Sequence, residues 1–239
     1  AVIEADVHRA DGTLVPTQTR LSAFQAHDGC SMTAGVVRDV SDRVAREREL
    51  RDRIDQQAAV TDLGQRAIEE ASLDGFLGAV VERVADTLDV EYCQVLDLDE
   101  ECEELTLREG AGWDPDLVGE ATISALEDDS QAAYTLGSQQ PVVVDDLTTE
   151  WRFSGPELLR THDVRSGITT VIGSSDEPWG ILGVHATEVD AFSRQDATFL
   201  DGVANVVTAA IERHRHESEL VRQREELVAL NSLNDVVRD

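Results

Sequence analysis

The residues best suited to bind a small molecule lie between Asp145 and Arg165. Two aromatic side chains there flank an arginine, a pattern that can stack on and charge-pair with a small anionic ligand. The alternative is structural, because aromatic side chains in loops also fill space, and an arginine in an acidic chain has many carboxylates within reach. The candidate ligand-binding residues are Trp151, Arg152, Phe153, Leu158, Leu159 and Arg165.

Three cysteines could carry redox or metal chemistry. Cys30, Cys93 and Cys102 are an odd number and lack the short paired spacing of a metal motif. A redox role for Cys93 and Cys102 would need both thiols adjacent across a hairpin, with a lowered thiol pKa. The expected state is reduced, structural thiols in a reducing compartment, and thiol redox activity is the alternative.

One histidine lies in the middle of a predicted strand. His185 has no second metal-ligating residue two or four positions away, so it is predicted to be a half-buried side chain with satisfied hydrogen bonds. The sequence therefore predicts no metal site.

The charge of the chain argues against nucleic acid as a partner. Its net charge is −29, from 49 acidic and 20 basic residues, and it contains no lysine. Such a surface is typical of a salt-adapted protein, because molar salt shortens the Debye length to about 3 Å and screens the repulsion. Nucleic acid binding through this segment is not expected, because that needs a basic patch and none is visible.

The sequence also argues against a membrane protein. No apolar run approaches the ~20 residues of a membrane span, and the N-terminus lacks a signal-peptide pattern. A cytoplasmic protein is expected. The first residue is Ala1 and the only methionine is Met32, which suggests a piece of a longer polypeptide.

The elements that must position the candidate residues are clearest from Ser166 onward. Recurring β-branched residues predict strands over 168–172 and 181–187, joined by a turn rich in serine, proline and glycine. Ser193 and Asp196 have the spacing of a helix capping box. The helix that follows should lay one apolar face on the two strands: Phe199, Leu200, Val203, Val206, Val207, Ala210 and Ile211.

These residues resemble the C-terminal half of a GAF domain. The matching pattern is Trp179-Gly180-Ile181-Leu182-Gly183-Val184, then Phe192-Ser193, Asp196 and the alanine-rich helix. The resemblance implies an antiparallel sheet flanked by helices that binds small ligands or carries signals, without catalysis. It also implies that the loops before Ser166 close over the sheet. Bilin attachment is not expected, because Cys93 and Cys102 are not followed by histidine, and no haem or flavin site is identifiable.

The first forty residues predict three strands joined by turns at Asp11-Gly12 and Asp28-Gly29, ending in Asp39-Val40-Ser41-Asp42-Arg43. This order resembles the C-terminal part of a PAS domain. In that family the closing aspartate and the basic residue after it tie the last strand to the outgoing helix. The resemblance therefore implies a signal-relay role for Asp39 and Arg43, and the alternative is that they are a helix cap and a surface charge.

Further helices and strands follow from the hydrophobic periodicity. Residues 41–71 predict one long helix, or two with a kink near Gly64. An amphipathic helix is expected over 74–89. The remaining predicted elements are strands over 90–98, 105–109 and 141–144 and a short helix over 130–136.

The last helix continues beyond the expected domain and predicts a dimer. Its apolar residues alternate steps of three and four, with polar positions that could set the register, as in a parallel coiled coil. A homodimer through the linker helices is therefore expected. The predicted seam consists of Leu220, Gln223, Leu227, Leu230, Asn234 and Val237.

The expected fold class is α+β: a GAF-like antiparallel sheet flanked by helices, a partial PAS β-hairpin unit and long coiled-coil-like linker helices. The predicted domains are the C-terminal part of a PAS domain (1–43), a linker helix (44–64), a GAF domain (56–213) and an outgoing helix (214–239) that leads to a missing downstream domain.

The expected function is sensory. The domain order and lysine-free composition resemble haloarchaeal regulators of the bacterio-opsin activator type, and also sensor histidine kinases. The segment itself is not expected to be an enzyme. It would bind a small ligand or relay a conformational signal through its helices to an output domain. One alternative is a ligand-independent dimerisation scaffold, and the other is a thiol-based redox enzyme of GAF fold.

Overall fold

The structure is a computed structural model that describes residues 2–25, 31–99, 103–125, 130–138, 140–153, 155–174 and 176–236, with side chains as far as Glu226 in the last helix. The chain folds into two compact units, Ala1–Asp55 and Gln56–Asp239. In the described part of the chain, no helix is both long enough and apolar enough to cross a membrane.

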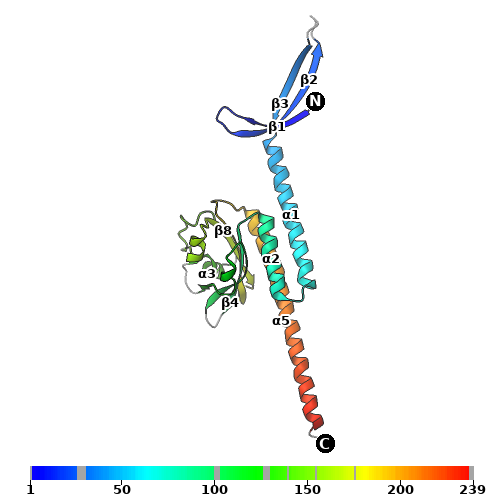
Figure 1. Ribbon diagram of the computed structural model, residues 1–239, viewed down its shortest axis with the longest axis vertical. Coiled ribbons are helices and arrows are strands. Elements are labelled where there is room, and N and C mark those ends of the chain that lie inside the picture. The colour runs from blue at the N-terminus through cyan, green and yellow to red at the C-terminus, as the bar shows by residue number, and fades with distance from the viewer. Residues whose placement is uncertain are drawn as a thin grey trace. The chain divides into compact units, whose positions relative to one another are not determined.

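The larger unit is built on a six-stranded antiparallel sheet with the order β6-β5-β4-β9-β8-β7 (Figure 1). The central strands β4 and β9 pair from Tyr92↔His185 to Asp97↔Gly180. This sheet and its flanking helices confirm the predicted α+β class. Its strands are β4 (Tyr92–Asp99), β5 (Glu104–Ala111), β6 (Thr122–Ser124), β7 (Val142–Val144), β8 (Ser166–Gly173) and β9 (Pro178–Ala186).

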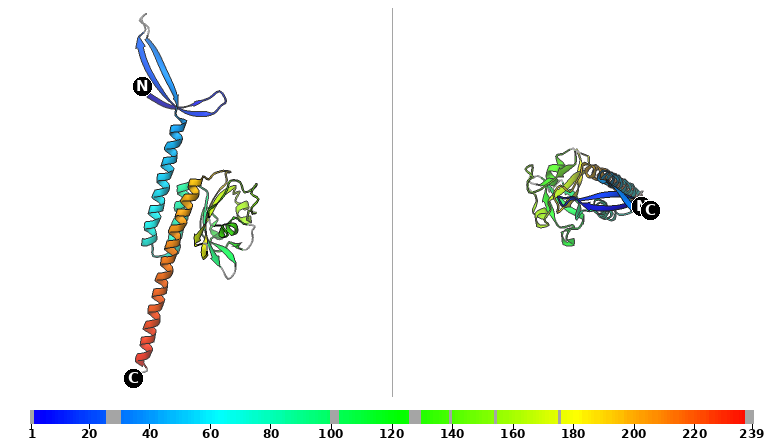
Figure 2. Two further views of the ribbon diagram at one scale, coloured as in Figure 1. Left: turned by 180° about the vertical axis from the view of Figure 1, so that it is seen from behind. Right: turned by 90° about the horizontal axis from the view of Figure 1, so that it is seen from above.

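Three helices cover one face of this sheet (Figure 2). The second half of α1 contributes Ala59 and Leu63, both fully buried, to the same apolar core as Leu182 and Val184 of β9. α2 begins after Ser72, whose hydroxyl accepts a hydrogen bond from the Gly75 backbone N–H at 3.4 Å. The three helices are α1 (Ser41–Glu69), α2 (Leu73–Leu88) and α5 (Arg194–Val236).

The start of α5 confirms the predicted capping box. The Ser193 backbone N–H donates to Asp196 Oδ2 at 2.8 Å, and the Asp196 N–H donates to Ser193 Oγ at 3.3 Å. The same carboxylate holds α1, because Gln56 Nε2 donates to Asp196 Oδ1 at 2.7 Å. Gln195 Nε2 in turn donates to Gln56 Oε1 at 3.0 Å. One buried glutamine thus fixes α1 against the first turn of α5.

The other face of the sheet is covered by loops and short helices. A second apolar cluster lies there, formed by Leu96, Leu107 and Ile181 of the sheet together with Trp113 and Leu159 of the covering loops. The short elements are the 3₁₀ turn Pro115–Leu117, α3 (Gln131–Leu136) and α4 (Glu157–Thr161). The candidate ligand residues belong to this side or to its rim.

The smaller unit is a three-stranded antiparallel sheet, β1-β2-β3, followed by the first turns of α1. The β1–β2 turn is stabilised by Asp11, whose Oδ1 accepts from the Thr13 backbone N–H at 2.9 Å, and by Gly12 at φ +87°. Large apolar side chains such as Val36 and Val37 remain exposed. The strands are β1 (Val2–His8), β2 (Leu14–Gln25) and β3 (Ser31–Asp39).

Of the two alternatives predicted for residues 41–71, the structure has the single helix, which runs over Ser41–Glu69 and passes through Gly64 without a break. The short strand β6 was not predicted, since three residues are too few for a period-two pattern. The predicted turn at Asp28-Gly29 lies outside the described residues, as do Cys30 and Cys102.

Candidate functional site

A cluster of buried polar side chains lies on the loop-covered face of the sheet. Five residues form this polar core, and each is at most 3% exposed: Gln94, Gln131, Thr135, Thr169 and His185. Burying polar groups costs free energy unless they are hydrogen-bonded, so their presence under the loops needs a physical reason.

Strand alternation places these side chains on one face. Cys93 and Val95 of β4 join the helix-covered core, so Gln94 between them points to the loops. The same logic applies to His185, which lies between Val184 and Ala186 of β9. The signal was present in the sequence as polar residues at every second position of otherwise apolar strands, but it did not identify a site without the three-dimensional pairing.

The centre of the polar core is a contact between β4 and β9. Gln94 Nε2 lies 3.3 Å from His185 Nε2. Because an amide nitrogen only donates, this ring nitrogen must accept, and the hydrogen of the neutral imidazole is then on Nδ1. Burial lowers the pKa of His185 to about 3, so the ring is neutral at physiological pH.

Several polar atoms of the cluster lack partners. Gln94 Oε1, Gln131 Oε1 and His185 Nδ1 are buried, and none makes a hydrogen bond within the described structure. The Nδ1 atom faces β8, since a Cβ added to Gly167 would lie 2.4 Å from it. The two glutamine oxygens are thus acceptors for which the described residues supply no donor.

Hydroxyl groups extend the cluster towards α3. Thr135 Oγ1 donates to the Gln131 carbonyl oxygen at 2.7 Å and lies 2.6 Å from Thr169 Oγ1, which therefore donates to it. Gln131 Nε2 donates to the Val142 carbonyl oxygen at 3.2 Å. Gly183 makes room at the centre, because a Cβ there would approach both Thr169 and Gln94 within 3.4 Å.

Aromatic rings cover the histidine end of the cluster. The Trp113 ring lies 4.5 Å from Tyr92, 5.1 Å from His162 and 6.2 Å from His185, between ring centroids. Its indole N–H donates to the Cys93 carbonyl oxygen at 3.1 Å, which fixes the ring over β4. The aromatic rings thus enclose the histidine end of the cluster next to neutral hydrogen-bonding groups.

The predicted ligand-binding residues do not gather in one place. Trp151 is 89% exposed. Arg152 forms an ion pair with Glu150 at 2.6 Å and donates to the Val143 carbonyl oxygen at 2.8 Å. Hydrogen bonding from Arg152 lowers the pKa of Glu150 to about 2. The guanidinium also lies 5.5 Å from the ring centroid of Phe153.

The other predicted ligand residues make internal contacts as well. Phe153 is buried against Val142 and Val144, whereas Leu158 and Leu159 belong to the apolar cluster under the loops. Arg165 pairs with Asp146 at 3.0 Å, and this hydrogen bonding lowers the pKa of Asp146 to about 2. Both arginines are thus paired with carboxylates, and the six residues are divided among separate contact groups.

The predicted relay residues make separate contacts in the smaller unit. Asp39 Oδ1 accepts from the Ser41 backbone N–H at 2.9 Å, at the start of α1, and its Oδ2 pairs with Arg9 at 2.8 Å. Arg43 pairs with Glu4 of β1 at 2.8 Å and with Glu47 at 3.0 Å. Each residue therefore joins the sheet to the helix through its own partners.

Part of the predicted dimer seam is described. Leu220 is 57% exposed, and Gln223 Nε2 donates to Glu219 Oε1 at 2.8 Å on the same helix. The side chains of Leu227, Leu230 and Asn234 are outside the described part, and Val237 lies outside the described residues altogether.

The histidine and cysteine expectations have different outcomes. His185 is fully buried with one unpartnered nitrogen, so the prediction of a half-buried, satisfied side chain was wrong; both faces of the central strand β9 are covered. Cys93 is also fully buried, and burial raises its pKa well above the usual thiol range. Among the described residues, no three histidine, cysteine or acidic side chains are grouped as metal ligands would be.

Comparison with known proteins identifies the fold. The family model described as GAF domain matches residues 72–211. The GAF domain of an Acinetobacter phosphoenolpyruvate-protein phosphotransferase is 19% identical, with a TM-score of 0.59, and the match covers 69% of this chain and 97% of that one. No curated protein sequence matches the chain significantly.

Two ligand-bound structures share this fold. The phycocyanobilin-bound GAF domain of a cyanobacterial phytochrome is 18% identical, with a TM-score of 0.57, and covers 68% of this chain and 96% of its own. The free methionine-R-sulfoxide reductase from Neisseria meningitidis, in complex with its substrate, is 15% identical, with a TM-score of 0.59. The match covers 68% of this chain and 91% of that one. At these identities the likeness concerns the fold alone.

Proposed function

The chain belongs to the GAF domain family, and from that premise we propose that it is a sensory module that binds a small neutral ligand over the polar core. The observation that carries the proposal is a pair of buried glutamine oxygens, Gln94 Oε1 and Gln131 Oε1, that accept no hydrogen bond from any residue that the structure describes. An unsatisfied buried acceptor costs about 1–3 kcal/mol, and a ligand that donates hydrogen bonds to both would remove that cost.

The charges of the site favour a neutral ligand. None of the five polar core residues carries a charge at pH 7, because burial lowers the pKa of His185 to about 3. Arg152 and Arg165, whose charges would suit an anionic ligand, are paired with Glu150 and Asp146. The ligand we propose carries N–H or O–H donors on a planar frame that packs against Trp113.

We further propose that ligand binding acts through the helices. The helix-covered face shares strands β4 and β9 with the polar core, so a shift of Gln94 or His185 displaces the residues that contact α1 and α5. Gln56 joins these two helices at Asp196, 2.7 Å away. A small change in the sheet would therefore alter the packing of α1 on α5 and bias an output domain.

The broader assignment rests on the sequence. The three-stranded N-terminal sheet followed by α1 supports a C-terminal part of a PAS domain over 1–43, and we propose that the protein is a cytoplasmic signalling protein of the bacterio-opsin activator or histidine kinase type. The segment itself is proposed to be without catalytic activity. A homodimer through the linker helices is proposed as its functional form, with no nucleic acid or membrane contact through this segment.

Native mass spectrometry of gently purified protein tests the ligand proposal. The expected result is a protein mass increased by one small molecule, or a mass increase after incubation with a panel of neutral heterocycles. The Gln94→Met variant should lose this binding, because its side chain has no acceptor, while the exposed Gln57→Met variant should keep it. Absence of any bound molecule in the wild type would favour the ligand-independent scaffold.

A further inference from the structure

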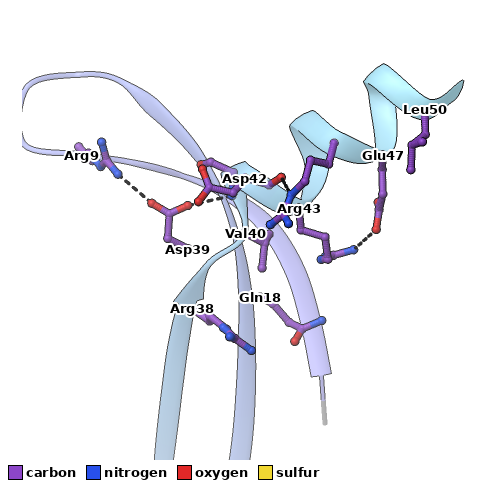
Figure 3. Close-up of a pocket in the computed structure, with 11 residues that line it drawn as sticks. Arg9, Gln18, Arg38, Asp39, Val40, Asp42, Arg43, Glu47 and Leu50 are labelled. Carbon is purple, nitrogen blue, oxygen red and sulfur yellow. Dashed lines mark hydrogen bonds and ion pairs between the residues drawn. The ribbon is translucent and has the colours of Figure 1, made fainter. Parts of the chain in front are cut away.

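A hollow of about 1150 Å³ lies in the smaller unit, where the sheet meets the first turns of α1 (Figure 3). Its wall contains four arginines: Arg9, Arg38, Arg43 and Arg46. The chain has 20 basic residues against 49 acidic ones, so a hollow lined by four arginines is more basic than the composition of the chain.

Two of these arginines are already paired. Arg9 contacts Asp39 at 2.8 Å, and Arg43 contacts Glu47 at 3.0 Å and Glu4 at 2.8 Å. The paired side chains are all exposed, and such pairs contribute about 0–1 kcal/mol each. These two arginines shape the wall and neutralise its carboxylates.

The other two arginines have uncommitted charges. The guanidinium of Arg46 uses only its Nε, which donates to the Asp42 carbonyl oxygen at 2.9 Å, and the Arg38 side chain makes no hydrogen bond or ion pair with any residue that the structure describes. Asp42 is the one acidic side chain of the wall that forms no ion pair within the described structure. Among the described residues, the hollow therefore holds two guanidinium groups without an ion pair against one carboxylate without an ion pair.

The wall also has apolar parts. Val40 is 8% exposed and lies between Arg38 and the first turn of α1, and Leu50 is 58% exposed at the helical end of the hollow. An inorganic ion would leave the exposed Leu50 side chain uncovered, whereas an organic molecule would cover it and the small exposed part of Val40.

We propose that this hollow binds a small organic oxyanion, with its carboxylate or phosphate group on Arg38 and Arg46 and its carbon frame on Val40 and Leu50. A guanidinium presents two parallel N–H groups that match two oxygens of either anion, which a point charge does not. This arginine site is separate from the polar core, since it lies in Ala1–Asp55 and binds the opposite class of ligand.

Isothermal titration of the full chain tests the proposal, with citrate, pyrophosphate and ADP as probes. Ionic strength is kept constant with KCl, because any salt screens a net charge of −29. Binding of pyrophosphate and ADP but not citrate would identify a phosphate site, and binding of citrate alone would identify a carboxylate site. Tighter binding of ADP than of pyrophosphate would support the apolar contact. Binding of none of the three would overturn the proposal.

Matched variants locate the binding. The Arg38→Gln/Arg46→Gln variant should bind the probe at least tenfold more weakly than the wild type. The Arg51→Gln/Arg53→Gln variant, with the same charge change on the exposed surface of α1, should differ in affinity by less than twofold. Arg38→Lys/Arg46→Lys keeps the charge but removes the paired donors, and an intermediate loss is expected. An equal loss of affinity in both glutamine variants would contradict binding at Arg38 and Arg46, because it would show a general charge effect. Binding at the polar core is measured separately with Gln94→Met.

Discussion

Gln94 and His185 meet across β4 and β9, with Gln94 Nε2 3.3 Å from His185 Nε2 and both side chains buried. This is the one hydrogen bond of the imidazole within the described structure, because Nδ1 has no partner. The contact is therefore a polar pair in which each side chain depends on the other, inside a sheet whose other face packs on the helices mainly through apolar side chains.

Replacing one member of this pair should cost more than replacing both. Gln94→Met leaves the His185 ring without a donor, and His185→Leu leaves the Gln94 amide without an acceptor, so each should lower the free energy of unfolding by about 1–3 kcal/mol. In the double variant both unsatisfied groups are gone, and stability should return to about the wild-type value. Urea unfolding of the four proteins gives the coupling energy, expected at about 2–6 kcal/mol, because the two single losses of about 1–3 kcal/mol each are both absent from the double variant. Additive losses would contradict the pairing.

The buried histidine should make stability depend on pH. The pKa of His185 is lowered to about 3 in the folded protein from its ordinary 6.5, so below pH 6.5 the unfolded chain binds a proton that the folded chain does not. The free energy of unfolding should therefore fall by about 1.4 kcal/mol between pH 7.5 and 5.5 through this group. The decrease should be absent from the Gln94→Met/His185→Leu variant.

Asp146 and Glu150 do not contribute to this change of stability between pH 7.5 and 5.5. The pKa values of Asp146 and Glu150 are lowered to about 2 by hydrogen bonds from arginines, so their stabilising effect is lost only as pH falls from about 4.5 towards 2. The other histidines are the same in both proteins. An equal pH dependence in wild type and double variant would show that His185 already binds a proton in the folded state.

The hydrogen bonds of Gln56 between α1 and α5 should make a measurable contribution to the free energy of unfolding. Gln56 is 6% exposed and bonds to Asp196 at 2.7 Å and Gln195 at 3.0 Å. Gln56→Ala should lower the free energy of unfolding by about 1.5–3 kcal/mol, since hydrogen bonds to charged groups are among the stronger ones. Gln57→Ala, at an exposed position of the same helix, should have little effect. Similar effects of the two substitutions in urea unfolding would contradict a stabilising role of the Gln56 hydrogen bonds.

The sequence predicted the elements far better than the site. β-Branched runs and the Ser193–Asp196 capping box were local signals, and they located β8, β9 and the start of α5. The contact of Gln94 with His185 joins residues 91 positions apart, and strand register decides it. The aromatic and arginine residues near 152 were conspicuous in the sequence, but nothing there showed that Glu150 and Asp146 would pair with the arginines.

The thiol of Cys93 should be unreactive in the folded protein. The residue is fully buried, and burial raises its pKa, so little thiolate forms. In a Cys30→Ser/Cys102→Ser variant, a thiol reagent at pH 8 should label Cys93 only after urea is added. Rapid labelling in native buffer, or sulfoxide reduction that depends on Cys93, would favour the redox-enzyme alternative over the sensory proposal.

The proposed dimer can be tested at two neighbouring positions of α5. Leu220 and Val221 are 57% and 58% exposed, but only Leu220 falls on the predicted seam. In a coiled-coil dimer, Leu220→Glu would place two like charges in the interface and should weaken association at least tenfold, as measured by sedimentation equilibrium in high salt. Val221→Glu adds the same charge outside the seam and should leave the dimer intact. A monomeric wild type, or equal effects of both substitutions, would contradict the seam, because the proposed relay needs paired helices that meet at Leu220.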